Sequence, residues 1–172
     1  MKIVSRLTTA VLVGALCAGA AFAKDSSTRF LKNAAEGGLA EVSMSELAMR
    51  KTGNPKIKEF AETMVRDHAA VNTQALALVK KLGVTPQANP ISASLSADAA
   101  AKLSQYAKLD GAAFDRAYVQ NEIAYHRTVN GALEATLIPS AQNPELKGLL
   151  QTGLTLFRAH QQHAEHLAAA VK

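Results

Sequence analysis

The amino-acid sequence predicts an all-α protein. Aromatic residues make up only 5% of the chain, alanine is abundant, and no run of β-branched residues indicates a strand. Apolar residues instead recur at steps of three and four, which is the spacing that places side chains on one face of a helix. The sequence therefore favours long amphipathic helices packed against one another.

Local signals divide the chain into four long helices and one short one. Thr52 and Gly53 end the first helix, and Asn54 with Pro55 begins the second, because asparagine caps free backbone N–H groups and proline fits the first helical turn. Gly83 ends the second helix. The expected ranges are 28–51, 55–82, 97–108 for the short helix, 111–137 and 144–171.

The link between the second and third long helices is much longer than the others. It covers residues 83–110, contains prolines and serines, and holds the short helix, for which Ser96 is the expected cap. Pro139 and the Asn143–Pro144 pair separate the last two helices. Short links combined with one long crossover are the wiring of a ferritin-like antiparallel four-helix bundle, which is the fold that we expect.

Residues 1–23 have the pattern of an export signal. Lys2 and Arg6 precede a short apolar run, and the small residues at 21–23 are typical of a signal-peptidase site. We expect cleavage after Ala23, which leaves a single domain at 24–172 in the periplasm. Cleavage also removes Cys17, the only cysteine, so no disulfide is expected in the remaining chain.

Charge and hydropathy exclude two kinds of partner. Without Lys2 and Arg6 the basic residues number 19 − 2 = 17 against 14 acidic ones, which is a net charge of +3. The basic residues are scattered and no aromatic residues interleave with them, so we do not expect nucleic-acid binding. No later apolar run approaches the roughly 20 residues that span a bilayer, so no transmembrane segment is expected after cleavage.

Each long helix carries, in the middle of its apolar stripe, one histidine or glutamate, which are side chains that can bind a metal. At about 100° per residue, these side chains are surrounded by apolar neighbours while other charged residues turn outward. Because the midpoints of antiparallel helices meet, we expect them to form one polar layer. The candidates are Glu41, His68, His126 and His160, with Glu122 one turn before His126.

Two interpretations of this layer stay open. Burying a charged carboxylate or imidazole alone costs several kcal/mol, so something must satisfy these groups. One transition metal ion would do so, because imidazole and carboxylate are ordinary ligands of zinc, copper and iron. Alternatively, the same side chains form a metal-free hydrogen-bond layer, in which Asn72 and Asn130 could take part.

Three segments carry a resemblance to a known family: "NAAEGGLAEVSMSELA", "FAETMVRDH" and "GAAFDRAYV". Over residues 28–171 the chain resembles the exported bacterial proteins described as domain of unknown function 4142, which are labelled periplasmic or outer-membrane proteins. The resemblance implies a ferritin-like bundle in the periplasm, with association with the outer membrane left open. It implies no particular reaction.

The chain departs from the ligand pattern of ferritin-like di-iron proteins, in which two helices carry Glu-x-x-His. Val65 lies three residues before His68, Phe157 lies three before His160, and Glu122 precedes His126 by four. A second pair of bridging carboxylates is therefore missing. This favours a mononuclear site with histidine ligands and one glutamate over two-iron oxygen chemistry.

The expected function follows from these residues. No serine or cysteine nucleophile with a base and no phosphate-binding loop stands out, so the sequence favours a binding protein over an enzyme. We expect an exported bundle that binds a transition metal in its core, for metal handling or stress protection. The alternative is a metal-free structural or partner-binding protein of the envelope.

Overall fold

The computed structural model describes residues 38–83, 85 and 90–170. Within these ranges the regular secondary structure is entirely helical and contains no strand. The all-α prediction is confirmed for this part of the chain. The predicted signal segment and the first half of the predicted helix 28–51 lie outside the described residues.

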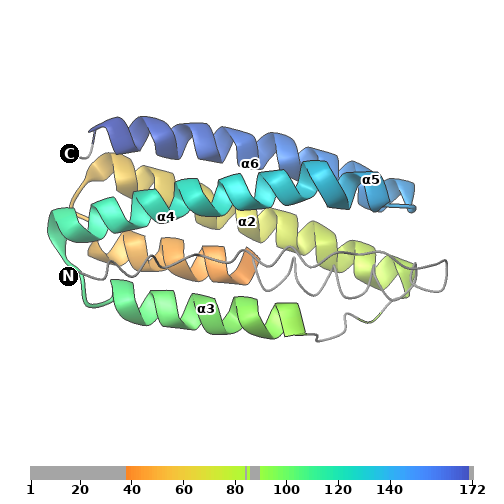
Figure 1. The fold of residues 1–172 in the computed structure, drawn as a ribbon, viewed down its shortest axis with the longest axis horizontal. Helices are drawn as coiled ribbons and strands as arrows, with labels where there is room; N and C mark the ends of the chain where they lie inside the picture. The colour runs from red at the N-terminus through yellow and green to blue at the C-terminus, as the bar shows by residue number, and fades with distance from the viewer. Residues whose placement is uncertain (1–37, 84, 86–89, 171–172) are drawn as a thin grey trace, which may run out of the picture.

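The helices run side by side along one long axis (Figure 1). The first described segment, residues 38–51, ends where the sequence predicts. The second half of the chain packs α6 against α4 and α2, and α3 lies along the opposite side of the molecule (Figure 1). The elements are α2 (Pro55–Leu82), α3 (Pro90–Tyr106), α4 (Gly111–Ala132), η1 (Leu133–Leu137), α5 (Ile138–Ser140) and α6 (Pro144–Ala170).

Helix α2 has the predicted bounds because local capping fixes both ends. The Asn54 side chain accepts a hydrogen bond from the backbone N–H of Lys56 at 3.0 Å, and Pro55 occupies the first helical position. At the other end Gly83 adopts the left-handed conformation with φ 61°, and its N–H bonds back to the last turn. These contacts involve neighbouring residues only, which is why the sequence reveals them.

Helix α3 is longer than predicted and begins at Pro90, not at residue 97. The prediction used Ser96 as the cap, but Ser96 lies inside the helix. Pro90 suits a first helical turn, and no glycine or second proline interrupts the helix after it. The long crossover thus contains a helix of 17 residues.

The third long helix does not stop at residue 137. Helix α4 passes into η1, a π-helical segment in which the N–H of Ile138 bonds to the carbonyl of Leu133, and α5 then carries Pro139 within its short length. Proline normally interrupts a helix because its ring clashes with the preceding turn and it has no N–H. The wider π turn just before Pro139 loosens that geometry, so the chain reverses only after Ser140.

The hydrophobic core consists of two clusters at different levels along the bundle. One cluster joins residues 38–51, α2, α4 and α6, and its largest fully buried members are Tyr118, Phe60, Phe114 and Ile57. The other lies toward the η1 end and is built from leucines: Leu78, Leu133, Leu146 and Leu150. Buried polar side chains separate the two clusters.

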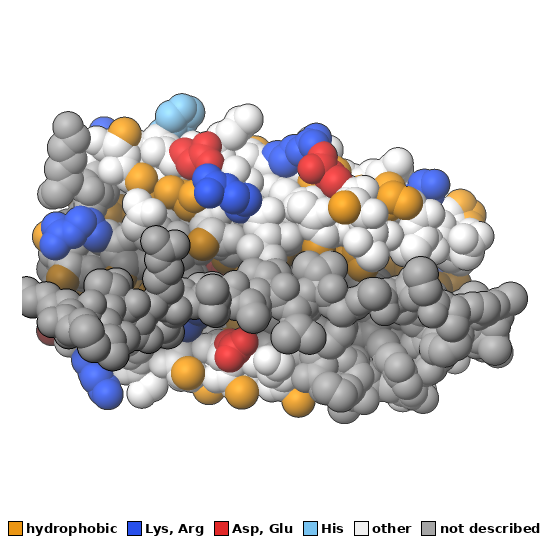
Figure 2. Space-filling model, viewed as in Figure 1, with side chains coloured by type: hydrophobic (Ala, Val, Ile, Leu, Met, Phe, Trp, Pro, Cys, Tyr) orange, Lys and Arg blue, Asp and Glu red, His pale blue; other side chains and the backbone are white. Residues whose placement is uncertain are grey.

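The described surface shows no single dominant feature in the view of Figure 2. Lysine and arginine side chains alternate with aspartate and glutamate, and hydrophobic side chains are scattered among them (Figure 2). None of the helices in the described ranges combines the length and apolarity needed to cross a membrane.

Phe60 offers a direct test of the first cluster, because its side chain is completely buried against the rings of Tyr118 and His163. We expect Phe60→Ala to lower the free energy of unfolding by about 3–5 kcal/mol, since it removes a large apolar side chain and leaves a cavity. Urea denaturation followed by circular dichroism measures the loss. Leu76→Ala on the same helix is the control, because Leu76 is 58% exposed. Similar losses for both variants would contradict this view of the core.

Candidate metal centre

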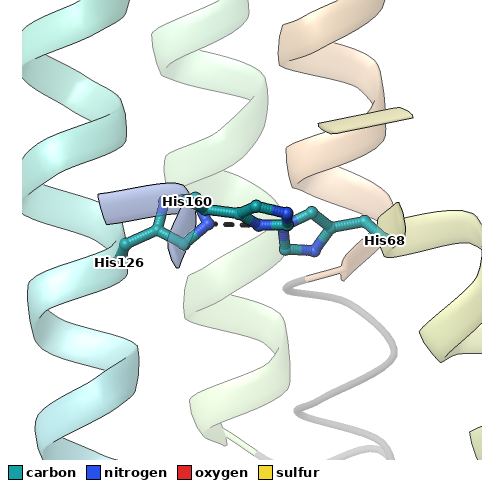
Figure 3. Close-up of side chains that lie close together, drawn as sticks. All are labelled: His68, His126 and His160. Carbon is teal, nitrogen blue, oxygen red and sulfur yellow. Dashed lines mark hydrogen bonds between the residues drawn. The ribbon is translucent and has the colours of Figure 1, made fainter. Parts of the chain in front are cut away.

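Three histidines from three helices meet between the two core clusters. His68 comes from α2, His126 from α4 and His160 from α6, and all three are buried. One ring nitrogen of each lies within 4.8 Å of those of the other two. Figure 3 shows the rings turned toward one another from their separate helices. The expectation that these positions converge in the bundle interior is met for the three histidines.

The hydrogen bonds of His126 fix which of its ring nitrogens is free. Its Nδ1 lies 2.9 Å from the backbone carbonyl of Glu122, one turn earlier in α4. A carbonyl only accepts hydrogen bonds, so Nδ1 carries the proton and donates it. In the neutral ring Nε2 then keeps its lone pair, and Nε2 is the atom that faces His68.

Asp67 accepts a hydrogen bond from His160 and so fixes which ring nitrogen of His160 is free. The His160 Nε2 lies 2.9 Å from Oδ2 of Asp67, which is held on α2 next to His68. Burial alone would raise the pKa of Asp67, but hydrogen bonds from Arg66 and His160 together hold that pKa below its ordinary value. The carboxylate is therefore an acceptor at neutral pH, and Nε2 donates to it. The other nitrogen, Nδ1, is buried and has no hydrogen-bond partner among the described residues.

His68 occupies the position between these two rings. Its Nε2 lies 3.4 Å from Nε2 of His126, the contact drawn as a dashed line in Figure 3. Because Nε2 of His126 is an acceptor, His68 donates this hydrogen bond. The His68 ring also stacks on Phe157, with ring centroids 4.8 Å apart and planes 6° apart. Phe157 therefore fixes the plane of the His68 ring.

Burial keeps the three imidazoles neutral. Burial is the main cause, and together with the nearby His126 and His160 it lowers the pKa of His68 to about 3. Burial also lowers the pKa of His126, although the nearby Glu41 raises it in part. The pKa of His160 is lowered by burial in the same way, although the hydrogen bond to Asp67 raises it in part. At neutral pH each ring thus has one protonated nitrogen and one lone pair, which is the form that binds metals.

The two predicted glutamates are buried beside the histidines, but they are not part of the group of three. Oε2 of Glu122 lies 3.7 Å from Nδ1 of His126, the nitrogen that points away from His68. Burial and the neighbouring Glu41 raise the pKa of Glu122 well above its ordinary value. Glu41 accepts a hydrogen bond from Ser45 at 3.2 Å, and Ser45 in turn contacts the Tyr118 hydroxyl at 2.9 Å. The role of either carboxyl group as a ligand stays a prediction.

The two predicted asparagine partners have different surroundings. Asn130 is buried and donates a hydrogen bond to Gln161 at 3.1 Å, so it contacts α6 instead of a histidine. Asn72 lines a cavity that begins at His68. Within the described ranges, neither asparagine makes a hydrogen bond to a histidine.

Asp67 is the functional residue that the sequence analysis missed. It lies about 100° around α2 from His68 and so outside the apolar stripe used to select candidates. Its contact with His160 joins residues far apart in the chain. The available signal was an acidic residue directly beside an inward-facing histidine, because histidines that bind metals usually donate their second N–H to a carboxylate or carbonyl.

The residues present fit a transition metal ion. Two of the three histidines donate one N–H to an oxygen acceptor and keep the other nitrogen unprotonated, which is the ordinary arrangement of metal-binding histidines. The unpartnered, buried Nδ1 of His160 is the kind of atom that a ligand would satisfy. Neutral imidazole is a common ligand of zinc, copper and iron.

Fold and site together define a helical protein with a buried three-histidine cluster between its helices. A family model for domain of unknown function (DUF4142) matches residues 15–167. The chain therefore belongs to the DUF4142 family, as the resemblance in the sequence indicates. Comparisons with curated proteins and with solved structures found no match.

The lowered pKa of His68 predicts acid sensitivity of the metal-free protein. Unfolded His68 takes up a proton below pH 6.5, whereas folded His68 does so only near pH 3. Stability from its burial is therefore complete above pH 6.5 and is lost as the pH falls through this window. We expect His68→Gln to reduce the slope of unfolding free energy against pH by about 1.4 kcal/mol per pH unit there.

Urea denaturation at several pH values in the presence of a chelator measures this slope. His166→Gln is the matched control, because His166 is an exposed histidine outside the cluster. It should keep the slope of the unmodified protein. An unchanged slope in His68→Gln would contradict the burial of a neutral His68.

Proposed function

We propose that this protein is an exported helical bundle that binds one transition metal ion through His68, His126 and His160, for metal handling or stress protection. The observation that supports this most directly is the convergence of three buried ring nitrogens within 4.8 Å. Burial costs each imidazole its hydration, so three of them rarely meet in a protein interior without a partner that compensates this cost.

The donor set narrows the choice of metal. Three neutral imidazoles suit zinc, copper and iron better than magnesium or calcium, which prefer oxygen ligands. Glu122 holds the His126 ring through its backbone carbonyl, and Asp67 holds His160. Glu41 and Glu122 are buried close to the histidines, and we keep both carboxyl groups as candidate ligands.

Three further features of the proposal come from the sequence. The charged, then apolar, then small-residue pattern of residues 1–23 supports export to the periplasm. The long crossover between α2 and α4 supports ferritin-like wiring. The absence of a recognisable nucleophile and base supports a binding or storage role over a catalytic one.

Metal content tests the proposal directly. Protein purified from the exported compartment should contain a transition metal, and His68→Ala/His126→Ala should reduce that metal to background, because two of three nitrogen ligands are lost. Elemental analysis after dialysis measures the content. His163→Ala/His166→Ala is the matched control, since both residues are exposed histidines of α6. Equal metal content in the two double variants would overturn the proposed site.

Asp67→Asn is a second test that keeps the three histidines in place. Asparagine is nearly isosteric but has no charge, so it holds the Nε2–H of His160 less strongly. We expect the affinity for zinc to fall by about 10–100-fold. Competition with a chromogenic chelator measures the affinity, and circular dichroism confirms the fold. Unchanged affinity would show that Asp67 does not orient a ligand.

The second candidate function is that of a structural or partner-binding protein whose buried histidines form a polar layer without a metal. It is favoured by the contacts His68–His126 at 3.4 Å and His160–Asp67 at 2.9 Å, which satisfy much of the layer without an ion. The two candidates differ in their response to metal. A bound ion stabilises the folded state by about 2.7 kcal/mol at one hundred times its dissociation constant, whereas a metal-free layer should show the same melting temperature with zinc and with chelator.

A further inference from the structure

A cavity of about 200 Å³ lies next to the histidine layer, on the side of the leucine cluster. It is lined by Gly38 and by residues of α2, α4, η1 and α6, from His68 at one end to Leu137 of η1 and Leu146 of α6. It is separate from the space between the three ring nitrogens. The metal-binding proposal gives it no role.

The end of the cavity near the histidines is polar. His68, Asn72 and Tyr125 line it there. No hydrogen bond to the Asn72 amide or the Tyr125 hydroxyl is made by another described residue. The Asn72 amide packs directly on the backbone of Gly38, where an added Cβ would overlap it. Asn72 is thus held in place at this end, and its amide and the Tyr125 hydroxyl are the polar groups there that have no hydrogen bond from another described residue.

The rest of the cavity is apolar. Leu133 and Leu137 of η1 face Leu146 and Leu150 of α6 across it. Among the described residues, the aromatic side chain packed against the leucine cluster is Phe157, which is only partly buried, whereas Phe60, Phe114 and Tyr118 are fully buried in the other cluster. The π turn widens the helix at this point, and such turns are frequent at ligand sites. Gly153 adds room, because its nearest neighbour beyond the backbone is the Phe157 ring, 3.6 Å from where a Cβ would lie.

We propose that this cavity binds a small aromatic alcohol, that is, a single ring carrying one hydroxyl group. The ring lies among the leucines, and the hydroxyl lies toward Asn72 and Tyr125. An apolar cavity of about 150 Å³ accommodates benzene, so a volume of about 200 Å³ holds one substituted ring. The inference is distinct from metal binding, because it uses neither His126 nor His160, but His68 borders both the cavity and the histidine cluster.

A pair of ligands of nearly equal size tests the two ends of the cavity separately. p-Cresol and toluene differ by one hydroxyl group, so their affinities compare the polar end directly. Both are titrated into the chelator-treated protein and followed by isothermal titration calorimetry and by amide NMR shifts. We expect both ligands to bind, and p-cresol to bind at least fivefold more tightly than toluene.

Two substitutions with matched controls locate the binding. Asn72→Ala should remove most of the preference for p-cresol, while Gln74→Ala, at an exposed position of α2, should keep it. Ala75→Leu places a larger side chain in the cavity and should weaken both ligands at least tenfold. Ala77→Leu is its control, because Ala77 is exposed and lies outside the cavity lining.

The outcomes are distinct. No saturable binding of either ligand would overturn the proposal, and so would unchanged affinities in Ala75→Leu. Equal affinities for toluene and p-cresol in the unmodified protein would overturn the role of Asn72 and Tyr125. Thermal melting of Ala75→Leu separates a filled cavity from misfolding, since filling a cavity leaves the melting temperature equal or higher. None of these results depends on whether the histidines hold a metal.

Discussion

The burial of three imidazoles at one level of the bundle is the constraint on which the rest of the structure depends. Each ring must be neutral, because a charged ring would lose its hydration without a matching counter-charge. Each must also place its single N–H on an acceptor. The Glu122 carbonyl and the Asp67 carboxylate provide two of these acceptors, and His126 provides the third. Burial and hydrogen bonding together leave the remaining lone pairs at predetermined positions.

This layer also divides the hydrophobic core into parts with different properties. The cluster around Phe60, Phe114 and Tyr118 is filled by aromatic rings that contact one another. The cluster beyond His68 is made of leucines and encloses a cavity. Because large buried rings contribute most to hydrophobic stabilisation, the aromatic cluster can hold the helices together while the leucine cluster retains open space. The aromatic cluster on one side of the histidines thus provides most of the stability, and the leucine cluster on the other side contains the proposed ligand site.

Features set by neighbouring residues could be predicted from the sequence. The bounds of α2 follow from Asn54 and Gly83, and the inward position of His68 follows from helical periodicity. Features set between helices could not be predicted. Which nitrogen of His160 is free depends on Asp67, 93 residues away in the chain. The start of α3 at Pro90 was also missed, because Ser96 suits the beginning of a helix as well. The π turn before Pro139 was missed because helical periodicity alone does not distinguish it from an α-helical turn.

The hydrogen-bonded layer and a metal-bound layer use almost the same arrangement of side chains. His126 and His160 would keep their protonated nitrogens on the same acceptors in both states. Only His68 would change, because its Nε2–H, which now points at Nε2 of His126, would have to move to Nδ1. This change alters no net charge and breaks a hydrogen bond worth about 1 kcal/mol net, and an Nδ1–H left without an acceptor would cost about 1–3 kcal/mol more. Structural zinc sites contribute about 10–16 kcal/mol in small peptides, so the existing hydrogen bond is too weak to prevent a suitable ion from binding.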